Sequence, residues 1–149
     1  MNVAELKKIM AIKTSETGHS VLVDTCAWIE FLREKTSPLG DQVAALIAQD
    51  RTVLCGVVVA ELRQGLKLTD GQRHKVEVAK LQKIFDLLPC LATEEEDWHA
   101  AGQSLQQLRS QGITVPLTDA LIASIAKRCQ VQVLTLGAHF KALGFEVFV

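Results

Sequence analysis

The sequence has almost no excess charge of either sign and no long apolar run. Its 16 basic and 17 acidic residues leave a net charge of −1, which argues against a protein that coats nucleic acid by charge alone. No apolar run approaches the roughly 18 residues that a membrane-spanning helix needs, so we expect no membrane partner. With 48% hydrophobic residues in a chain of 149, the composition predicts an ordinary globular protein with one core.

The sequence also lacks the cysteine patterns of a metal site. Its four cysteines form no CxxC pair and no cluster with histidine, so we expect no zinc site. Buried, reduced thiols in a cytoplasmic protein are the better interpretation. These cysteines are Cys26, Cys55, Cys90 and Cys129.

The chain divides into a short leading segment and one domain. Residues 1–20 have a weak helical pattern followed by a polar stretch, without the apolar region and cleavage site of a signal peptide, and we interpret them as an appended arm, a leader or a fusion remnant. From residue 21 to 149, short apolar runs alternate with helical patterns, which predicts an α/β sandwich whose mainly parallel sheet is covered on both faces. Strands are expected at 21–23, 52–55, 87–91, 131–135 and 145–149, and helices from 25, at 41–50, 57–65, 71–85, 94–110 and 119–129.

The first strand ends in a carboxylate. Val21, Leu22 and Val23 run directly into Asp24, and a helical pattern with Trp28 on its apolar side begins at once. A charge at the carboxyl end of a buried strand is costly unless a positive group meets it. The simple alternative is that Asp24 caps the following helix.

Two more carboxylates interrupt apolar segments. Glu61 follows Val57-Val58-Val59-Ala60, and Asp119 precedes Ala120-Leu121-Ile122-Ala123. The alternative for Glu61 is a solvated helix position paired with Arg63 or Arg33, and for Asp119 a first-turn residue favoured by the helix dipole. If the three acids meet, their mutual repulsion favours a hard divalent cation, and oxygen ligands suit Mg²⁺ or Mn²⁺. Such an ion supports hydrolysis of a phosphodiester.

Four short blocks in this order resemble the PIN-domain ribonucleases, specifically the VapC-type toxins of VapBC toxin–antitoxin pairs. The blocks are Val23-Asp24-Thr25-Cys26-Ala27-Trp28-Ile29, Val59-Ala60-Glu61-Leu62-Arg63-Gln64-Gly65, Asp119-Ala120-Leu121-Ile122-Ala123 and Leu134-Thr135-Leu136-Gly137-Ala138-His139-Phe140. The resemblance covers residues 21–149.

The resemblance implies a Mg²⁺- or Mn²⁺-dependent endoribonuclease that acts on an RNA substrate, usually as a homodimer. It also implies a cognate VapB-like antitoxin whose C-terminal tail lies across the active site. Asp24, Glu61 and Asp119 match the family's first, second and third acids, which makes them the expected catalytic and metal-binding residues. Thr25 and Thr135 match hydroxyl positions beside the site.

The last block departs from the family pattern. Where the family commonly carries a fourth acid, this chain has Gly137, which supplies no ligand. Neither Asp97 nor His139 can be promoted in its place from sequence, and we expect His139 to pack near the strand end or to face solvent. Three interpretations stay open: a weaker one-metal nuclease, a natural pseudoenzyme, or a chain disarmed because its active form is toxic.

Other classes fit less well. A haloacid-dehalogenase-type phosphotransferase needs a second aspartate where Cys26 lies, and a receiver domain needs a lysine just after a late strand, where the chain has Leu136-Gly137-Ala138. The serious alternative to an enzyme is a PIN-fold module that binds RNA or an antitoxin without cleavage.

Overall fold

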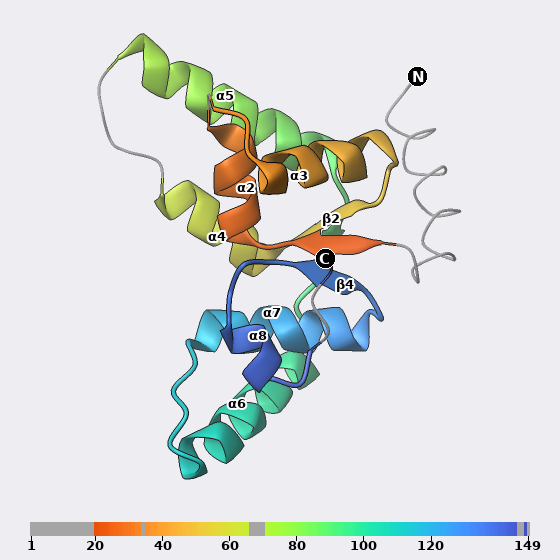
Figure 1. Ribbon diagram of the computed structural model, residues 1–149, viewed down its shortest axis with the longest axis vertical. Coiled ribbons are helices and arrows are strands. Elements are labelled where there is room, and N and C mark those ends of the chain that lie inside the picture. Colours follow the sequence, from red (N-terminus) through yellow and green to blue (C-terminus); the bar gives the residue numbers. More distant parts are fainter. Residues whose placement is uncertain (1–19, 34, 66–70, 146–147, 149) are drawn as a thin grey trace.

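The computed structural model describes residues 20–33, 35–65, 71–145 and 148, which form a parallel sheet between two layers of helices (Figure 1). The strands are β1 Val21–Val23, β2 Thr52–Cys55, β3 Cys90–Leu91 and β4 Gln132–Leu134, and their order in the sheet is β3-β2-β1-β4. Every pairing between them is parallel. The described helices are α2 Thr25–Leu32, α3 Pro38–Ala48, α4 Gly56–Gln64, α5 Gln72–Leu87, α6 Glu95–Ser110, α7 Leu117–Arg128 and α8 His139–Ala142.

The helices lie on both faces of the sheet. Figure 1 shows α2, α3 and α5 on one side of the strands and α6, α7 and α8 on the other. The predicted three-layer α/β sandwich is therefore confirmed. Because each strand of a parallel sheet must cross over before the next one begins, the helices between strands provide both covering layers.

Strand β1 is the centre of the core. It pairs with β2 on one side and β4 on the other, and Val21, Leu22 and Val23 are fully buried. Trp28 of α2 is also fully buried and packs edge-on against Phe31 at a centroid distance of 5.8 Å. Burial of an aliphatic side chain of this size contributes about 1.5–3 kcal/mol, so β1 is strongly fixed, and with it the point at which Asp24 leaves the sheet.

Helix starts were the weakest part of the sequence prediction. Helix α3 begins at Pro38 rather than at residue 41, because the Ser37 hydroxyl caps it by accepting a hydrogen bond from the Gly40 N–H at 3.1 Å. Proline suits this position because its missing N–H would have no helical partner there. Helix α7 likewise begins at Leu117, with Pro116 as its N-cap, and not after Thr118.

The start of α6 differs by one residue. The helix begins at Glu95 rather than at residue 94, because Glu94 is its N-cap, in a reciprocal arrangement where the Asp97 carboxylate accepts a hydrogen bond from the Glu94 N–H at 2.8 Å. Gly112 follows the C-terminal end of this helix, with a φ of 77° that glycine adopts without strain.

Two connections differ from the prediction. Helix α5 continues to Leu87, which shortens the expected strand at 87–91 to Cys90–Leu91. The expected loop at 136–144 contains the short helix α8, which the fully buried Phe140 anchors to the core. The predicted strand at 145–149 and the interpretation of the leading arm depend on residues that lie largely outside those described. Within the described ranges, no helix is long and apolar enough to cross a bilayer.

Candidate active site

Asp24 directly follows β1, and its carboxylate accepts hydrogen bonds from several donors. Its Oδ2 accepts from the Thr135 hydroxyl at 2.7 Å, and its Oδ1 accepts from the Thr25 N–H at 2.7 Å. The carboxylate is 8% exposed, and its backbone N–H donates to Leu134 O of β4 at 3.0 Å. The capping alternative is thus confirmed, because Asp24 is the N-cap of α2. The carboxylate also accepts a hydrogen bond from Thr135, the residue that follows β4, and so connects the ends of β1 and β4. Capping of α2 does not require this second contact.

Glu61 is tied to the same corner of the fold through Thr25. The Thr25 hydroxyl donates to Glu61 Oε2 at 2.5 Å, so one residue contacts both carboxylates. The alternative that Glu61 pairs with Arg33 or Arg63 is wrong. Arg33 instead contacts Glu30, and Arg63 donates to Gln82 and stacks on the Phe85 ring.

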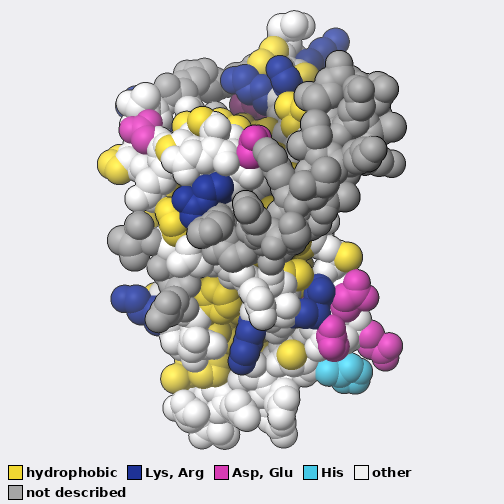
Figure 2. Space-filling view, turned by 90° about the vertical axis from the view of Figure 1, so that its right-hand side faces the viewer, with side chains coloured by type: hydrophobic (Ala, Val, Ile, Leu, Met, Phe, Trp, Pro, Cys, Tyr) yellow, Lys and Arg dark blue, Asp and Glu magenta, His cyan; other side chains and the backbone are white. Residues whose placement is uncertain are grey.

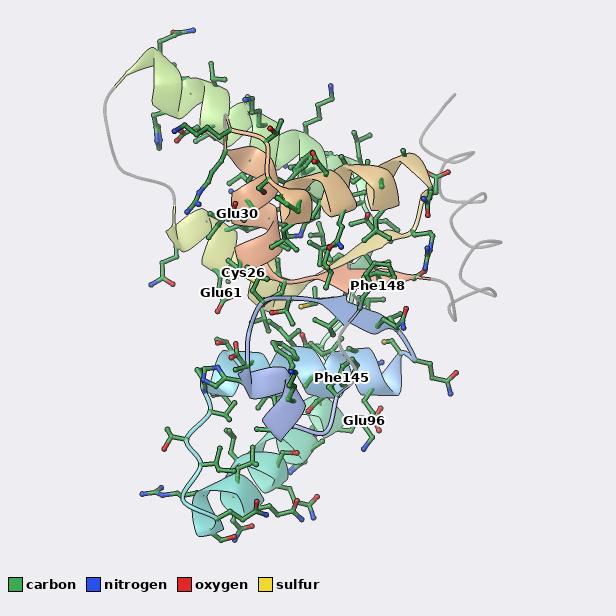
Figure 3. All side chains as sticks on the ribbon, in the orientation of Figure 1. Cys26, Glu30, Glu61, Glu96, Phe145 and Phe148 are labelled. Atoms are coloured by element: carbon green, nitrogen blue, oxygen red, sulfur yellow. The ribbon has the colours of Figure 1, made fainter. Side chains whose placement is uncertain are left out.

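Cys26 contributes a thiol to this group. Its Sγ donates to Asp24 Oδ2 at 3.4 Å and accepts from the Leu136 N–H at 3.4 Å. In Figure 3, Cys26 lies at the start of α2 and Glu30 lies further along the same helix. Burial, and then the nearby Asp24 charge, raise the pKa of the thiol, with the Leu136 N–H opposing them. Cys26 therefore acts as a neutral hydrogen-bonding group at neutral pH.

Asp119 is held by a different partner. It lies in the first turn of α7, as the dipole alternative predicts, but its Oδ2 also lies 2.6 Å from His139 Nδ1 of α8. The Asp119 side chain is 19% exposed and that of His139 is 46% exposed. The prediction that His139 packs near the strand end or faces solvent did not include this contact. The sequence analysis did not predict the short helix α8, which brings His139 into contact with Asp119.

Of the three predicted acids, Asp24 and Glu61 are therefore linked through Thr25, and Asp119 has a separate partner, His139. Across the described ranges, no three histidine, cysteine, aspartate or glutamate side chains lie close enough together to hold one metal ion. The pair nevertheless fits a hard cation in kind, since Mg²⁺ is commonly bound by one or two carboxylates and keeps several waters. Asp24 and Glu61 are thus the residues that fit Mg²⁺ or Mn²⁺, while Asp119 contacts His139 and does not join them in a group of three.

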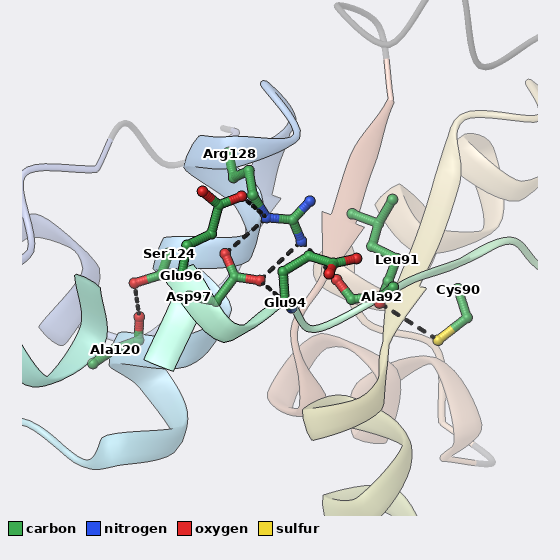
Figure 4. Close-up of polar contacts among 9 residues, drawn as sticks. All are labelled: Cys90, Leu91, Ala92, Glu94, Glu96, Asp97, Ala120, Ser124 and Arg128. Carbon is green, nitrogen blue, oxygen red and sulfur yellow. Dashed lines mark hydrogen bonds and ion pairs between the residues drawn. The ribbon is translucent and has the colours of Figure 1, made fainter. Parts of the chain in front are cut away.

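Asp97 is excluded from the site by a structural role (Figure 4). Its carboxylate is paired through two hydrogen bonds with Arg128 of α7, at 2.9 Å to Nε and 2.8 Å to a terminal nitrogen. Burial alone raises the pKa of Asp97, but the Arg128 and Glu94 hydrogen bonds outweigh it and hold the pKa below its ordinary value. The hydrogen bonds that Arg128 donates to the Asp97 carboxylate, in turn, raise the pKa of the guanidinium.

The first turn of α6 also carries acidic side chains on the surface. Glu94, Glu95 and Glu96 line a shallow depression with His99, and Figure 2 shows an acidic patch with a histidine beside it. His99 lies 3.8 Å from Glu95, and both side chains are more than four-fifths exposed, at 81% and 90%. Solvent screens such a pair, so this patch stabilises little.

Comparison with known proteins decides the family, because the PIN-domain family matches residues 21–146. The chain belongs to the PIN-domain family. It is 28% identical over 127 residues to VapC ribonuclease Mb1587 of Mycobacterium bovis and to ribonuclease VapC11 of Mycobacterium tuberculosis, over 83% of this chain and 90% of each relative. The resemblance to VapC-type PIN ribonucleases is thereby confirmed.

Solved structures of PIN-domain proteins share the fold. FitAcB from Neisseria gonorrhoeae is 27% identical, with a TM-score of 0.74 over 87% of this chain and 96% of that one. A complex of FitAB with a DNA fragment matches with 26% identity and a TM-score of 0.76, over 86% of this chain and 93% of that one.

Gly137 is the point at which this PIN domain departs from the family pattern. Its N–H donates to the Thr135 hydroxyl at 2.9 Å, and a Cβ at this position would lie 3.2 Å from that hydroxyl oxygen and 3.4 Å from the Phe140 ring. The loop is therefore closely packed around glycine. Any side chain here presses on the hydroxyl that donates to Asp24.

Proposed function

We propose that this PIN domain is the toxin of a type II toxin–antitoxin pair, a Mg²⁺- or Mn²⁺-dependent endoribonuclease that hydrolyses RNA phosphodiesters. The observation that carries the proposal is the meeting of Asp24 and Glu61 at Thr25, at the carboxyl edge of the sheet. The PIN-domain match and the VapC relatives support the ribonuclease class. A bound divalent ion would supply an activated water and stabilise charge on a phosphoryl oxygen.

The residues of the chain orient the two carboxylates. Asp24 accepts hydrogen bonds from Thr25, Cys26 and Thr135, which hold its side chain in one orientation. Glu61 accepts from the Thr25 hydroxyl, which fixes the direction of one of its oxygens. Both side chains are thus held in defined rotamers before a cation binds.

The first experiment is cleavage of a single-stranded RNA with added Mn²⁺. We expect the wild-type chain to cut and to stop when EDTA is added, and we expect Asp24→Asn and Glu61→Gln to lose at least about 100-fold in rate, since each removes a ligand charge. Thr52→Val serves as a control away from the site. Cleavage that continues in EDTA, or that survives both substitutions, would contradict the proposal.

A specific observation also favours a second candidate, a PIN module that binds RNA or antitoxin without cutting. Gly137 supplies no carboxylate, and the described acids do not gather in threes. Comparison of Gly137→Asp with Gly137→Ala separates two effects, because both add the Cβ that presses on Thr135 but only aspartate adds a ligand. Cutting by Gly137→Asp alone would indicate a lost fourth ligand. A wild-type chain that neither cuts nor binds Mn²⁺ would favour the non-cleaving module.

We also propose partners from the same resemblance. VapBC and FitAB complexes are among the solved structures with this fold, which supports a small VapB-like antitoxin for this chain, and we infer a homodimer as in the family. We expect a basic antitoxin side chain to reach Asp24 or Glu61, since a cationic donor pairs strongly with a carboxylate. Co-expression with the neighbouring small open reading frame, followed by co-purification, tests the pairing. A chain that cuts RNA in vitro but is harmless in cells without any partner would count against it.

The distribution of basic side chains favours RNA binding at one site over binding along a continuous basic surface. On the face shown in Figure 2, lysine and arginine side chains lie in separate groups and not in one continuous band. With a net charge of −1 as well, we expect binding to depend on the site and only moderately on salt.

A further inference from the structure

Helix α6 forms the outer edge of one helical layer. In Figure 1 it lies beyond α7 from the sheet, and its inner side, with Ala101 and Leu108, is buried. On another side of the helix, Trp98 is 53% exposed, and it is the one aromatic among the large exposed hydrophobic side chains of the described ranges. One turn further along, a shallow depression is lined by Gly102, Leu105, Gln106, Arg109 and Ser110. A large exposed aromatic side chain therefore lies next to a hollow on the same helix.

Gly102 has no packing reason within the described chain. It lies near the middle of a helix of 16 residues, where glycine is destabilising relative to alanine. A Cβ at this position would meet no atom within 4 Å, so the fold leaves room for a larger side chain. One use of glycine at such a place is the close approach of a group from outside the helix. The position therefore fits contact with another molecule.

The residues on this side of α6 are arranged symmetrically about Gly102. Glu95 and Arg109 lie seven residues before and after it, and Trp98 and Gln106 lie four residues before and after it. At 3.6 residues per turn, these five positions fall within about 80° of one another around the helix axis. We call these five residues the α6 side face. One end of this face is acidic and the other is basic, so the face is complementary to its own reversed copy.

We propose that a second copy of this chain packs on the α6 side face, with the two α6 helices antiparallel and Gly102 of both copies at the two-fold axis. In this arrangement Glu95 of each copy faces Arg109 of the other, and Trp98 of each faces Gln106 of the other. A two-fold interface must be self-complementary, because the same patch is used on both subunits. The α6 side face meets this condition in charge, and Gly102 allows the two helices to approach closely where they cross.

The charges favour a second copy over RNA as the molecule that covers this face. Three acidic side chains, Glu94, Glu95 and Glu96, lie in the first turn or at the cap of α6, and they repel phosphates. The inference assigns a surface to the homodimer proposed above and rests on that proposal, but it needs neither a bound cation nor RNA cleavage. A standard interface buries about 800 Å² on each partner, which is more than one side of a single helix provides. We therefore expect weak association, with a Kd on the order of 10–100 µM.

The test is sedimentation equilibrium of the full chain at concentrations from about 5 to about 500 µM, chosen to span this range of Kd. The variants are Glu95→Arg and Arg109→Glu, each of which places like charges opposite one another at both ends of the interface. A third variant, Gly102→Gln, adds a bulky side chain at the axis but suits a helix better than glycine does. Lys83→Glu is the matched control, since it makes the same change of charge as Arg109→Glu at an exposed position of α5, in the other helical layer (Figure 1).

We expect each of the three variants to associate at least about tenfold more weakly than wild type, and Lys83→Glu to associate like wild type. An equimolar mixture of Glu95→Arg with Arg109→Glu should form mixed dimers within about threefold of the wild-type Kd, because opposite charges then face each other at both ends. A mixture of Glu95→Arg with Lys83→Glu has the same net charges without this match and should not recover. Thermal unfolding at the lowest concentration verifies folding, and Gly102→Gln should unfold at or above the wild-type temperature.

Several results would overturn the inference. One is a wild-type chain that stays monomeric up to about 500 µM, and another is a dimer that all three variants leave unchanged, since it would use a different surface. Equal recovery in both mixtures would show that net charge alone drives association. A chain that is monomeric alone and has this face covered by a co-expressed antitoxin would overturn it too. RNA cleavage is measured separately, so a monomeric chain that cuts RNA removes only this inference, and a dimer that does not cut removes only the nuclease.

Discussion

Removal of Arg128 should destabilise the PIN domain more than any other single loss of a surface-reaching arginine that the structure describes. Arg128→Met leaves Asp97, whose side chain is 2% exposed, without its guanidinium partner. Breaking a fully buried pair costs about 3–5 kcal/mol, but the Arg128 side chain is 27% exposed and Asp97 keeps the Glu94 N–H. We therefore expect a loss of about 2–3 kcal/mol, and a fall in Tm of about 6–10 °C for a chain of this size.

Arg33→Met is the matched control. Arg33 also pairs with a carboxylate, that of Glu30, but its side chain is 62% exposed. Exposed pairs contribute about 0–1 kcal/mol, so this variant should unfold close to the wild-type temperature. Urea unfolding at pH 7, followed by tryptophan fluorescence, compares the two variants directly. Equal losses in both would refute the reasoning, because burial would then make no difference to the pair.

The pH dependence of this loss has a definite sign. The pKa of Asp97 is depressed in the folded protein, so its contribution is complete above the unfolded-state pKa and is lost as the pH falls through the lower folded pKa. Without Arg128, burial raises the Asp97 pKa. The difference in unfolding free energy between wild type and Arg128→Met should therefore be largest near neutral pH and shrink below about pH 4.

Further predictions concern the hydroxyls and thiols around the sheet. Thr135→Val removes the buried donor to Asp24 Oδ2 and should weaken Mn²⁺ binding by about tenfold or more, measured by calorimetry. Thr52→Val, at a buried hydroxyl without a hydrogen-bond partner among the described residues, should be neutral or stabilising by up to about 1 kcal/mol; a large destabilisation would contradict the assigned environment. Burial raises the pKa of the Cys55 thiol to about 11, although backbone hydrogen bonds oppose this in part. Iodoacetamide at pH 8 should therefore label Cys55 at least about tenfold more slowly than the exposed Cys90, as measured by peptide mass spectrometry.

The sequence carried most of the fold because apolar runs and their ends are local signals. The β1 run of Val21, Leu22 and Val23, and the carboxylate that follows it, could be placed without a structure because three buried aliphatics tolerate few alternatives. The first residues of the helices could not be predicted with the same accuracy. The cap of α3 depends on the Ser37 hydroxyl reaching Gly40, and a Ser-Pro-Leu-Gly stretch is also typical of a turn.

The site was only partly accessible to sequence reasoning for a similar reason. The pairing of Asp24 with Glu61 needs the Thr25 hydroxyl to face α4, and the contact of His139 with Asp119 needs a helix where a loop was expected. Asp97 could not be assigned a role from sequence, because its partner Arg128 lies 31 positions further along the chain. Side-chain partners between distant segments have no signature in one sequence.

The measurement that tests the central claim most directly is anomalous scattering from a crystal soaked in Mn²⁺. The account predicts one ion bound by oxygens of Asp24 and Glu61 at the carboxyl edge of the sheet, with Asp119 reaching it directly or through a water. An ion bound elsewhere, or no ion at these carboxylates at a concentration that supports RNA cleavage, would contradict it.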